Sequence, residues 1–301
     1  MERMVSAQNE GEALKVLDEC GYGVSAGGAV ETRLADAQGA LFDELQGAVP
    51  EPRLIDVFRL KYDYHNAKAL IKAEATGSDA RRLLVSGGRY DCQQLAEEFQ
   101  RESLSGTSAC FQQAVAAARR VLADTRDPQR SDVVLDKACY AEMAQLAADC
   151  ASPFLQGYVR LCIDVANLRT AVRVARMGKG GDFLLQVLMP GGSVTESALA
   201  AAQPEDLGNL FQSGALAKAA KLGAQAARPE GGTMLAFERE CDNALTRYVA
   251  GAKRVPFGEE PVIAFLHAKE AELTAIRIIL SGCRAGLDEA MIWERLRECY
   301  V

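Results

Sequence analysis

The sequence predicts an all-α protein built from three similar helical units. A pattern that starts at Pro52 returns at Pro153 and Pro261, and a period of about a hundred residues indicates a repeat architecture. Hydrophobic residues make up 49% of the chain and aromatic residues only 6%, which favours close helix packing over a β-sandwich. We therefore expect units at residues 1–105, 106–206 and 207–301.

The repeated pattern has fixed spacing. Eleven positions separate the proline from an acid in each copy, and a basic residue follows five positions after the acid. Proline suits the first position of a helix because it gives up no intrahelical hydrogen bond there. The residues are Pro52, Asp63, Asn66 and Lys68 in the first copy, Pro153, Asp164, Asn167 and Arg169 in the second, and Pro261, Glu272, Ala275 and Arg277 in the third.

Each copy reads as an amphipathic helix with one buried stripe. Arg59 and Arg160 precede the acids Asp63 and Asp164 by four residues, so we expect each to form a weak i, i+4 ion pair. The stripe residues are Leu60, Tyr64, Ala67 and Ile71, then Leu161, Val165, Leu168 and Val172, then Leu273, Ile276 and Leu280.

The other elements are also expected to be helical. Glycines and polar turns separate the apolar-periodic stretches, as turn chemistry predicts. The paired glycines 87–88 and 191–192 precede helices in the first and second units, and we interpret them as turns. Helices are expected over residues 9–20, 30–46, 90–102, 110–123, 132–150, 183–188, 195–202, 205–222, 234–250 and 285–301, with glycine-containing loops at 21–28 and 227–233.

Composition excludes several classes of function. The formal net charge is −7, which argues against nucleic acid as a partner because such domains carry a net basic surface. Nine cysteines without a C-x-x-C pair fit a reducing compartment. The N-terminus lacks a signal-peptide apolar region, and no window of eighteen residues is apolar and free of charge. We expect a chain that is soluble, or peripheral to a membrane.

No motif predicts catalysis or a cofactor. Residues 177–183, MGKGGDF, lack the spacing of a phosphate-binding loop. His65 and His267 have no neighbouring cysteines, so a zinc site is not expected. Glu270 and Glu272 point in different directions on a helix and cannot act as an acid–base pair. We therefore expect no metal and no small-molecule substrate.

The recurring acid, Asn and base leave alternatives open. They could tie neighbouring signature helices together through buried hydrogen bonds, contact a partner directly, or lie on a solvated surface. A repeated basic face on a net acidic chain motivates the hypothesis of partner contact. The residues of that hypothesis are Lys68, Lys72, Arg169, Arg173 and Arg277.

Several blocks resemble one known family. The stretches FRLKYDYHNAKALIKA, YVRLCIDVANLRTAVRVARMGKGGDFL, MPGG, EEPVIAFLHAKEAELTAIRIILSG and LRECYV are similar, in that order, to the C subunit of V-type (A/V-type) ATPases, which is related to the d subunit of the eukaryotic vacuolar enzyme. The resemblance covers residues 12–301. It implies an all-helical fold of three units around a pseudo-threefold axis, shaped as a funnel.

The resemblance also implies a role and partners. Such a subunit is a non-catalytic rotor part of a proton or sodium ATPase or ATP synthase. It lies on the cytoplasmic face of the membrane, sits on the proteolipid ring and receives the central-shaft subunits D and F. Two departures stand out: the opening helical segment of the family is expected to be missing or short, and Ala275 replaces an Asn. The alternatives are a helical-repeat scaffold unrelated to rotary ATPases, or a helical enzyme, for which no clustered acid site is present.

Overall fold

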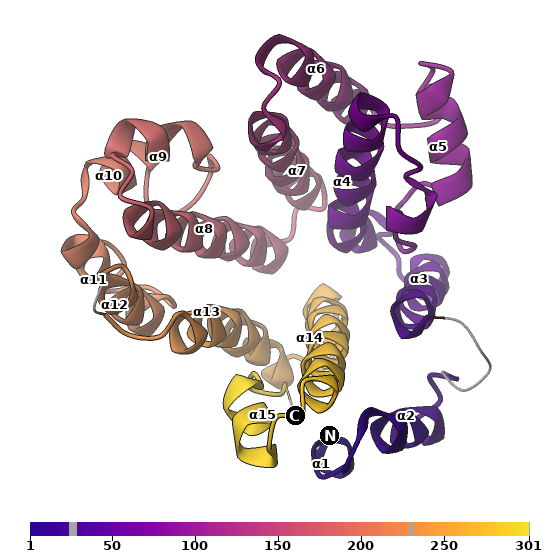
Figure 1. The fold of residues 1–301 in the computed structure, drawn as a ribbon, viewed down its shortest axis with the longest axis vertical. Coiled ribbons are helices and arrows are strands. Elements are labelled where there is room, and N and C mark those ends of the chain that lie inside the picture. The colour runs from indigo at the N-terminus through magenta and orange to yellow at the C-terminus, as the bar shows by residue number, and fades with distance from the viewer. Residues whose placement is uncertain (24–28, 229–230, 301) are drawn as a thin grey trace. The chain divides into compact units, whose positions relative to one another are not determined.

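The computed structural model describes residues 1–23, 29–228 and 231–300 (Figure 1). The described residues form α-helices and short 3-10 turns without a β-strand, which confirms the all-α class. They divide into two compact units. Unit 1 comprises residues 1–34, 160–188 and 192–301, and unit 2 comprises residues 35–159 and 189–191. The predicted division into three helical units stays a prediction.

The three signature helices are α4 (Arg53–Thr76), α8 (Pro153–Arg176) and α14 (Glu259–Arg284). Pro153 opens α8 as predicted, Pro52 is the residue before α4, and Pro261 is the third residue of α14. The third helix starts earlier than expected because Gly258, with φ of 113°, already turns the chain into it. Every residue of the predicted apolar stripes is buried, so the helical periodicity identified the packing faces correctly.

Unit 2 packs α6 (Ala109–Thr125) and α7 (Pro128–Asp149) against α4, with α5 (Cys92–Gln100) on another side. A 3-10 turn at Arg81–Leu83 lies between α4 and α5. Helix α7 begins four residues earlier than expected. The side chain of Asp127 caps it by accepting from the backbone N–H of Gln129, and Pro128 occupies the first helical position.

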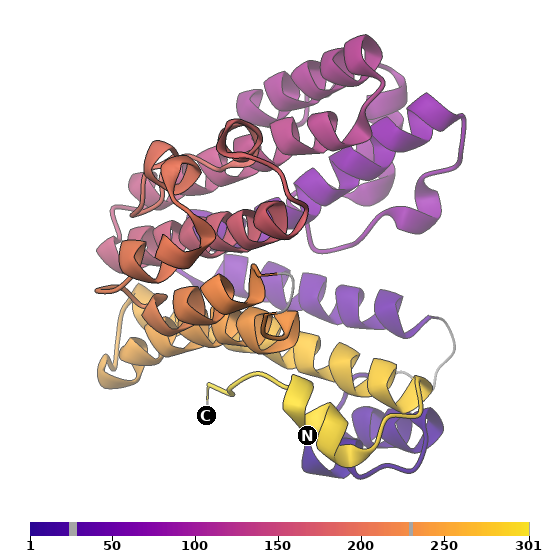
Figure 2. The ribbon, with the colours of Figure 1, turned by 60° about the vertical axis from the view of Figure 1, so that its left-hand side comes forward.

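Two apolar clusters can be described in unit 1 among the residues that the structure places. In one, α8 packs with α9 (Gly181–Val187), α10 (Glu196–Ala201), α11 (Leu207–Leu210), α12 (Ala217–Ala226) and α13 (Met234–Val249). In the other, α1 (Glu2–Val5), α2 (Glu10–Glu19), the start of α3 (Val30–Ala48) and α15 (Glu289–Arg295) pack on α14. Figure 2 shows the N-terminal helices beside α14.

The predicted bounds of two helices in unit 1 were wrong. The single helix expected over residues 205–222 is interrupted, because Phe211 and Leu216 on either side of a turn are both buried and the chain must bend to place them. The terminal helix ends at Arg295, and residues 296–300 continue without helix. Parts of the predicted loops, residues 24–28 and 229–230, and Val301 lie outside the described residues.

Candidate functional site

The first signature acid, Asp63, is fully buried on α4 and binds a turn after two glycines. Its Oδ1 accepts a hydrogen bond from the backbone N–H of Arg89 at 2.8 Å, and its Oδ2 accepts one from the Arg89 Nε at 2.7 Å. Arg89 directly follows Gly87 and Gly88. The acid therefore ties α4 to the turn that precedes α5.

The second signature acid, Asp164 on α8, makes the same connection. Its Oδ1 accepts from the backbone N–H of Ser193 at 2.8 Å, and its Oδ2 accepts from the Ser193 hydroxyl at 2.6 Å. Ser193 directly follows Gly191 and Gly192. Burial raises the pKa of Asp164, and the hydrogen bonds from Ser193 oppose that rise. The repeat is thus one of structure as well as of sequence.

Each turn needs glycine at its second position. A Cβ atom on Gly88 would lie 2.3 Å from the Oδ1 of Asp63, and one on Gly192 would lie 2.4 Å from the Oδ1 of Asp164. No side chain fits at these distances. The sequence places the two glycine pairs 24 and 27 positions after the two acids, and this recurrence was noted, but the contact between each acid and its turn was not predicted. The first glycine of each pair has a positive φ, 100° at Gly87 and 98° at Gly191.

Asn66 holds the same turn from a second point. Its amide donates to the carbonyl oxygen of Val85 at 3.0 Å and accepts from the Val85 N–H at 2.9 Å. The side chain is fully buried, as is that of Asn167 in the second copy. The bonds of Asp63, Asp164 and Asn66 therefore run to the turn of their own copy rather than to a neighbouring signature helix.

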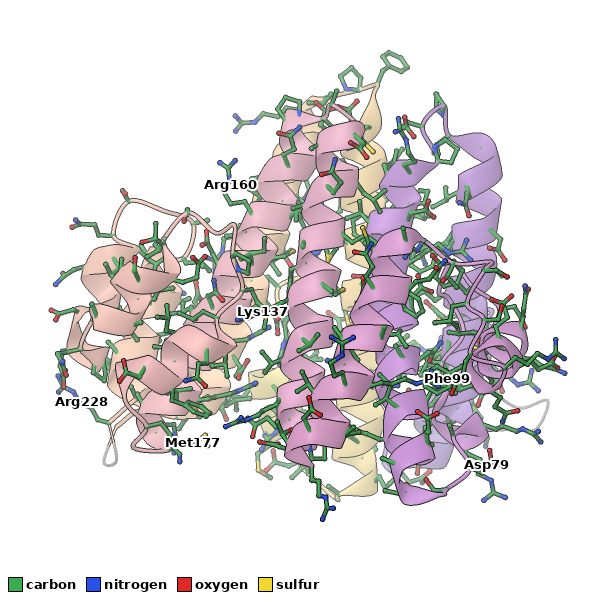
Figure 3. The ribbon with its side chains drawn as sticks, turned by 90° about the horizontal axis from the view of Figure 1, so that it is seen from above. Asp79, Phe99, Lys137, Arg160, Met177 and Arg228 are labelled. Atoms are coloured by element: carbon green, nitrogen blue, oxygen red, sulfur yellow. The ribbon has the colours of Figure 1, made fainter. Side chains whose placement is uncertain are left out.

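The two signature arginines differ. Arg59 is buried and donates to the Gly88 carbonyl oxygen, to Asp43 at 2.8 Å and to Gln46 at 2.6 Å. The expected i, i+4 pair with Asp63 is wrong, because that carboxylate is turned toward the backbone and guanidinium of Arg89. Arg160 is exposed and points away from the helices in Figure 3.

A buried polar cluster surrounds the first acid. Arg89 lies between the carboxylates of Asp63 and Glu142, with its Nη1 2.9 Å from Glu142. Glu142 on α7 also accepts from the Tyr64 hydroxyl at 2.7 Å and from the Ser108 hydroxyl at 2.7 Å. Burial raises the pKa of Asp63 to about 6 against the attraction of Arg89. Sequence reasoning missed Arg89 and Glu142, since neither recurs in the other copies.

The third copy is built differently. Glu272 accepts from Lys269 on its own helix at 2.8 Å. Burial and the nearby charge of Glu272 raise the pKa of Tyr22, which precedes α3. Ala275, at the Asn position, is buried in the cluster where the N-terminal helices pack on α14. Apolar contact with the N-terminal helices therefore contributes to the packing of the third signature helix.

All five predicted partner-contact cations form ion pairs within the chain. Each reaches from a signature helix to an acid on another helix, so each also contributes to packing. The pairs are Lys68 with Asp136, Lys72 with Asp132, Arg169 with Glu238 and Asp242, Arg173 with Glu238, and Arg277 with Glu31.

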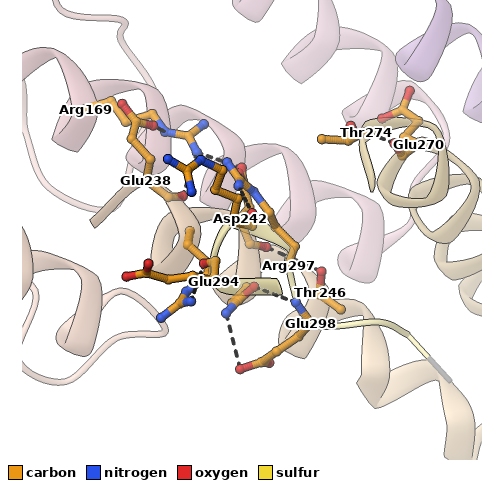
Figure 4. Close-up of polar contacts among 12 residues, drawn as sticks. Arg169, Glu238, Asp242, Thr246, Glu270, Thr274, Glu294, Arg297 and Glu298 are labelled. Atoms are coloured by element: carbon orange, nitrogen blue, oxygen red, sulfur yellow. Dashed lines mark hydrogen bonds and ion pairs between the residues drawn. The ribbon is translucent and has the colours of Figure 1, made fainter. Parts of the chain in front are cut away.

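Basic and acidic side chains alternate in a chain of ion pairs that runs from α8 through α13 to the C-terminal segment. Arg169 lies 2.6 Å from Asp242 on α13, and the other carboxylate oxygen of Asp242 accepts from Arg297 at 2.9 Å (Figure 4). The backbone N–H of Glu298 donates to Asn243 at 2.9 Å. These contacts satisfy backbone and side chains after Arg295, which explains why the predicted terminal helix does not continue.

Within the described ranges, no group of three or more His, Cys, Asp and Glu side chains is placed to hold a metal ion. His65 lies 3.2 Å from the Leu83 carbonyl oxygen, and His267 lies 3.1 Å from the Thr246 hydroxyl. None of the described helices is both long enough and apolar enough to cross a membrane.

Comparison with known proteins matches residues 1–295 to the family described as "ATP synthase (C/AC39) subunit". The chain is 24% identical to the C subunit of the V-type sodium ATPase of Enterococcus hirae, over 90% of this chain and 82% of that protein. It is 25% identical to the C subunit of the V-type ATP synthase of Thermus thermophilus, over 94% and 88%. It is 29% identical to the C subunit of the A-type ATP synthase of Halobacterium salinarum, over 89% and 81%.

Proposed function

The chain belongs to the ATP synthase (C/AC39) subunit family, and from this premise we propose that it is the non-catalytic rotor subunit that joins the central shaft to the membrane proteolipid ring. The family match over nearly the whole chain carries the proposal. The names of the relatives support it, since each is the C subunit of a V-type or A-type ATPase or synthase. In this role the protein is peripheral, on the cytoplasmic face, and couples ATP turnover to ion transport.

A coupling part must carry torque without local unfolding. The apolar stripes of α4, α8 and α14 are buried, and the buried bonds of Asp63 to Arg89 and of Asp164 to Ser193 fasten two of these helices to adjacent turns. Such satisfied buried groups favour a rigid element. The predicted three units around a pseudo-threefold axis, receiving the D and F subunits in a funnel, belong to the same proposal.

The predicted contact through Lys68, Lys72, Arg169, Arg173 and Arg277 remains part of the proposal. A carboxylate of the shaft or ring would have to compete with the acids that these cations already bind within the chain. Arg173 is the most accessible of the five, with 61% of its side chain exposed. We therefore place the strongest expectation of partner contact on Arg173.

Co-elution with a purified D–F shaft pair tests the proposal. The expected result is a one-to-one complex that weakens as salt rises, because exposed charges are screened over about 10 Å at 0.1 M salt. A second column run uses the detergent-solubilised proteolipid ring in place of the shaft. Failure of a folded, helical chain to bind either component would overturn the proposed link between the shaft and the ring.

A further inference from the structure

The first two signature helices end alike and then diverge. Gly77 follows the end of α4 directly, and Gly178 lies two residues beyond the end of α8; each stands fourteen residues after the acid of its copy and has a φ of 65°. From there to the first glycine of the pair is ten residues in the first copy and thirteen in the second. The first copy is therefore three residues shorter within this one segment.

In the second copy the longer segment folds as α9 and fills the space between α8 and α10. Leu184 of α9 is buried in the cluster that contains Val172 of α8 and Leu199 of α10. Phe183 and Val187 pack against the same cluster. The other face of α9, formed by Asp182, Leu185 and Gln186, is exposed. A short amphipathic helix thus completes the core of this copy.

In the first copy the shorter segment forms only the 3-10 turn at Arg81–Leu83. Counting back from the glycine pair, Ala80 stands in the position of Leu184, and Asp79 stands in that of Phe183. Leu83 corresponds to the packed Val187 but is 57% exposed. The large apolar groups that fill the second copy are therefore absent from the corresponding place in the first.

A groove of about 900 Å³ occupies that place, between the C-terminal half of α4, the segment 77–86 and α5. Its apolar lining includes Leu70, Leu84 and Phe99; Figure 3 labels Phe99 and the rim residue Asp79. This volume lies within the range of about 300 to 1,000 Å³ that is usual for ligand sites in proteins. The groove lies wholly within unit 2.

The rim of the groove is acidic. Three carboxylates line it, Glu74, Asp79 and Glu97, against one arginine, Arg81. Glu74 already pairs with Arg119. Glu97 accepts a hydrogen bond from the side chain of Gln93 at 3.3 Å. It lies 3.5 Å from Arg101, whose side chain is 73% exposed, and such surface ion pairs are weak. Charge complementarity therefore calls for a basic occupant.

We propose that this groove receives a short amphipathic helix of a partner protein, apolar on its inner face and basic on its outer face, in the place that α9 takes in the second copy. Helix-in-groove binding of this kind uses apolar anchors spaced along one helix face. The acidic rim selects the charge of the outer face. This proposal is independent of the contacts with shaft and ring.

A pair of matched peptides tests the proposal on the full chain. The probe is residues 179–189 with Asp182→Lys, Leu185→Lys and Gln186→Lys, and its control carries glutamate at the same three positions. Titration into isotope-labelled protein, followed by NMR, is expected to shift the signals of Leu84 and Phe99. At low salt the lysine peptide is expected to bind at least tenfold more tightly than the glutamate peptide, with a smaller difference at high salt.

Two variants localise the binding. Gln93→Trp, at an exposed residue that lines the groove, is expected to weaken binding of the lysine peptide at least tenfold. Ala117→Trp, at an exposed position of α6 outside the groove, is expected to leave it unchanged. The proposal is overturned by no binding at millimolar peptide, by equal binding of the two peptides, or by insensitivity to Gln93→Trp. Self-association of the chain that Gln93→Trp abolishes would also overturn it, since the occupant would then be a second copy.

Discussion

The carboxylate of Asp164 accepts hydrogen bonds from both the backbone N–H and the hydroxyl of Ser193, at 2.8 and 2.6 Å. Asp63 receives the backbone N–H of Arg89 at the same 2.8 Å. In both copies the donor is the residue after a glycine pair. The recurring acid thus has a structural task, which is to bind the end of a tight turn beneath its helix.

Alanine at either close-approach glycine should destabilise the fold. In Gly88→Ala the new Cβ would meet a carboxylate oxygen at 2.3 Å, and in Gly192→Ala at 2.4 Å, so the turn must move and the acid loses its backbone donor. We expect a loss of about 1 to 3 kcal/mol in the free energy of unfolding, measured by urea denaturation.

Gly47→Ala serves as the control. Gly47 lies exposed in α3, with no atom within 4 Å of the position that a Cβ would occupy, and alanine in a helix is favoured over glycine by about 0.5 to 1 kcal/mol. We expect a small gain in stability. Equal effects of Gly47→Ala and Gly88→Ala would contradict the close contact with Asp63.

Removing the amide of Asn66 should release the turn at its second attachment. Asn66→Ala leaves the N–H and the carbonyl oxygen of Val85 without their partner, at a cost of about 1 to 3 kcal/mol for each buried group left unsatisfied. Hydrogen exchange of the Val85 amide should accelerate more than tenfold. Asn209→Ala, at an exposed asparagine, should change stability by less than about 0.5 kcal/mol.

Stability of the first copy should depend on the ionisation of Asp63. Burial raises its pKa from 3.8 to about 6, so the folded state holds the proton more tightly than the unfolded state. The contribution of Asp63 is therefore fully present below pH 3.8 and is lost as the pH rises through about 6. A pKa difference of about two corresponds to roughly 3 kcal/mol.

The comparison of wild type with Asp63→Asn isolates this effect. Asparagine does not titrate, so the difference between the two unfolding free energies should fall by roughly 3 kcal/mol between pH 4 and 6.5 and then level off. Urea titrations at half-unit pH intervals measure it. If the difference in unfolding free energy stays constant or rises with pH, the attraction of Arg89 lowers the pKa of Asp63 at least as much as burial raises it.

The residue pattern of the sequence predicted those structural features that depend on a single helix, such as its buried face and its end. The stripe of Leu60, Tyr64, Ala67 and Ile71 is buried as expected, because helical periodicity alone decides which residues share a face. The end of α4 at Gly77 also follows from local chemistry, since glycine adopts the left-handed conformation found there. The all-α class rests on such local signals.

Side-chain contacts between residues that are far apart in the sequence could not be predicted from the residue pattern. Asp63 was expected to pair with Arg59 four residues away, but it binds Arg89 twenty-six positions along, where the path of an intervening turn decides the contact. The predicted C-terminal helix is too long for a similar reason, because Arg297 and Glu298 form hydrogen bonds with residues of α13. Both errors arise where tertiary hydrogen bonds override local preference.

Arg169 and Arg173 should separate a packing role from a partner role. Arg169 binds two acids on α13, and its side chain is 23% exposed. Arg169→Ala removes one cationic partner from Glu238 and from Asp242, so we expect the free energy of unfolding to fall by about 1 to 3 kcal/mol. Arg173 is 61% exposed and binds Glu238 alone, so Arg173→Ala should cost less than about 1 kcal/mol. Urea denaturation of both variants measures the difference.

Charge reversal at Arg173 then tests partner contact on a folded protein. Arg173→Glu should keep the helical content and nearly all the stability while weakening co-elution with the D–F shaft pair at low salt, because a carboxylate there would repel partner acids. Lys15→Glu on α2 provides a matched reversal outside the predicted face. If Arg173→Glu and Lys15→Glu bind the shaft as well as wild type does, the exposed cation of α8 serves packing alone, and the partner surface must be sought among other residues.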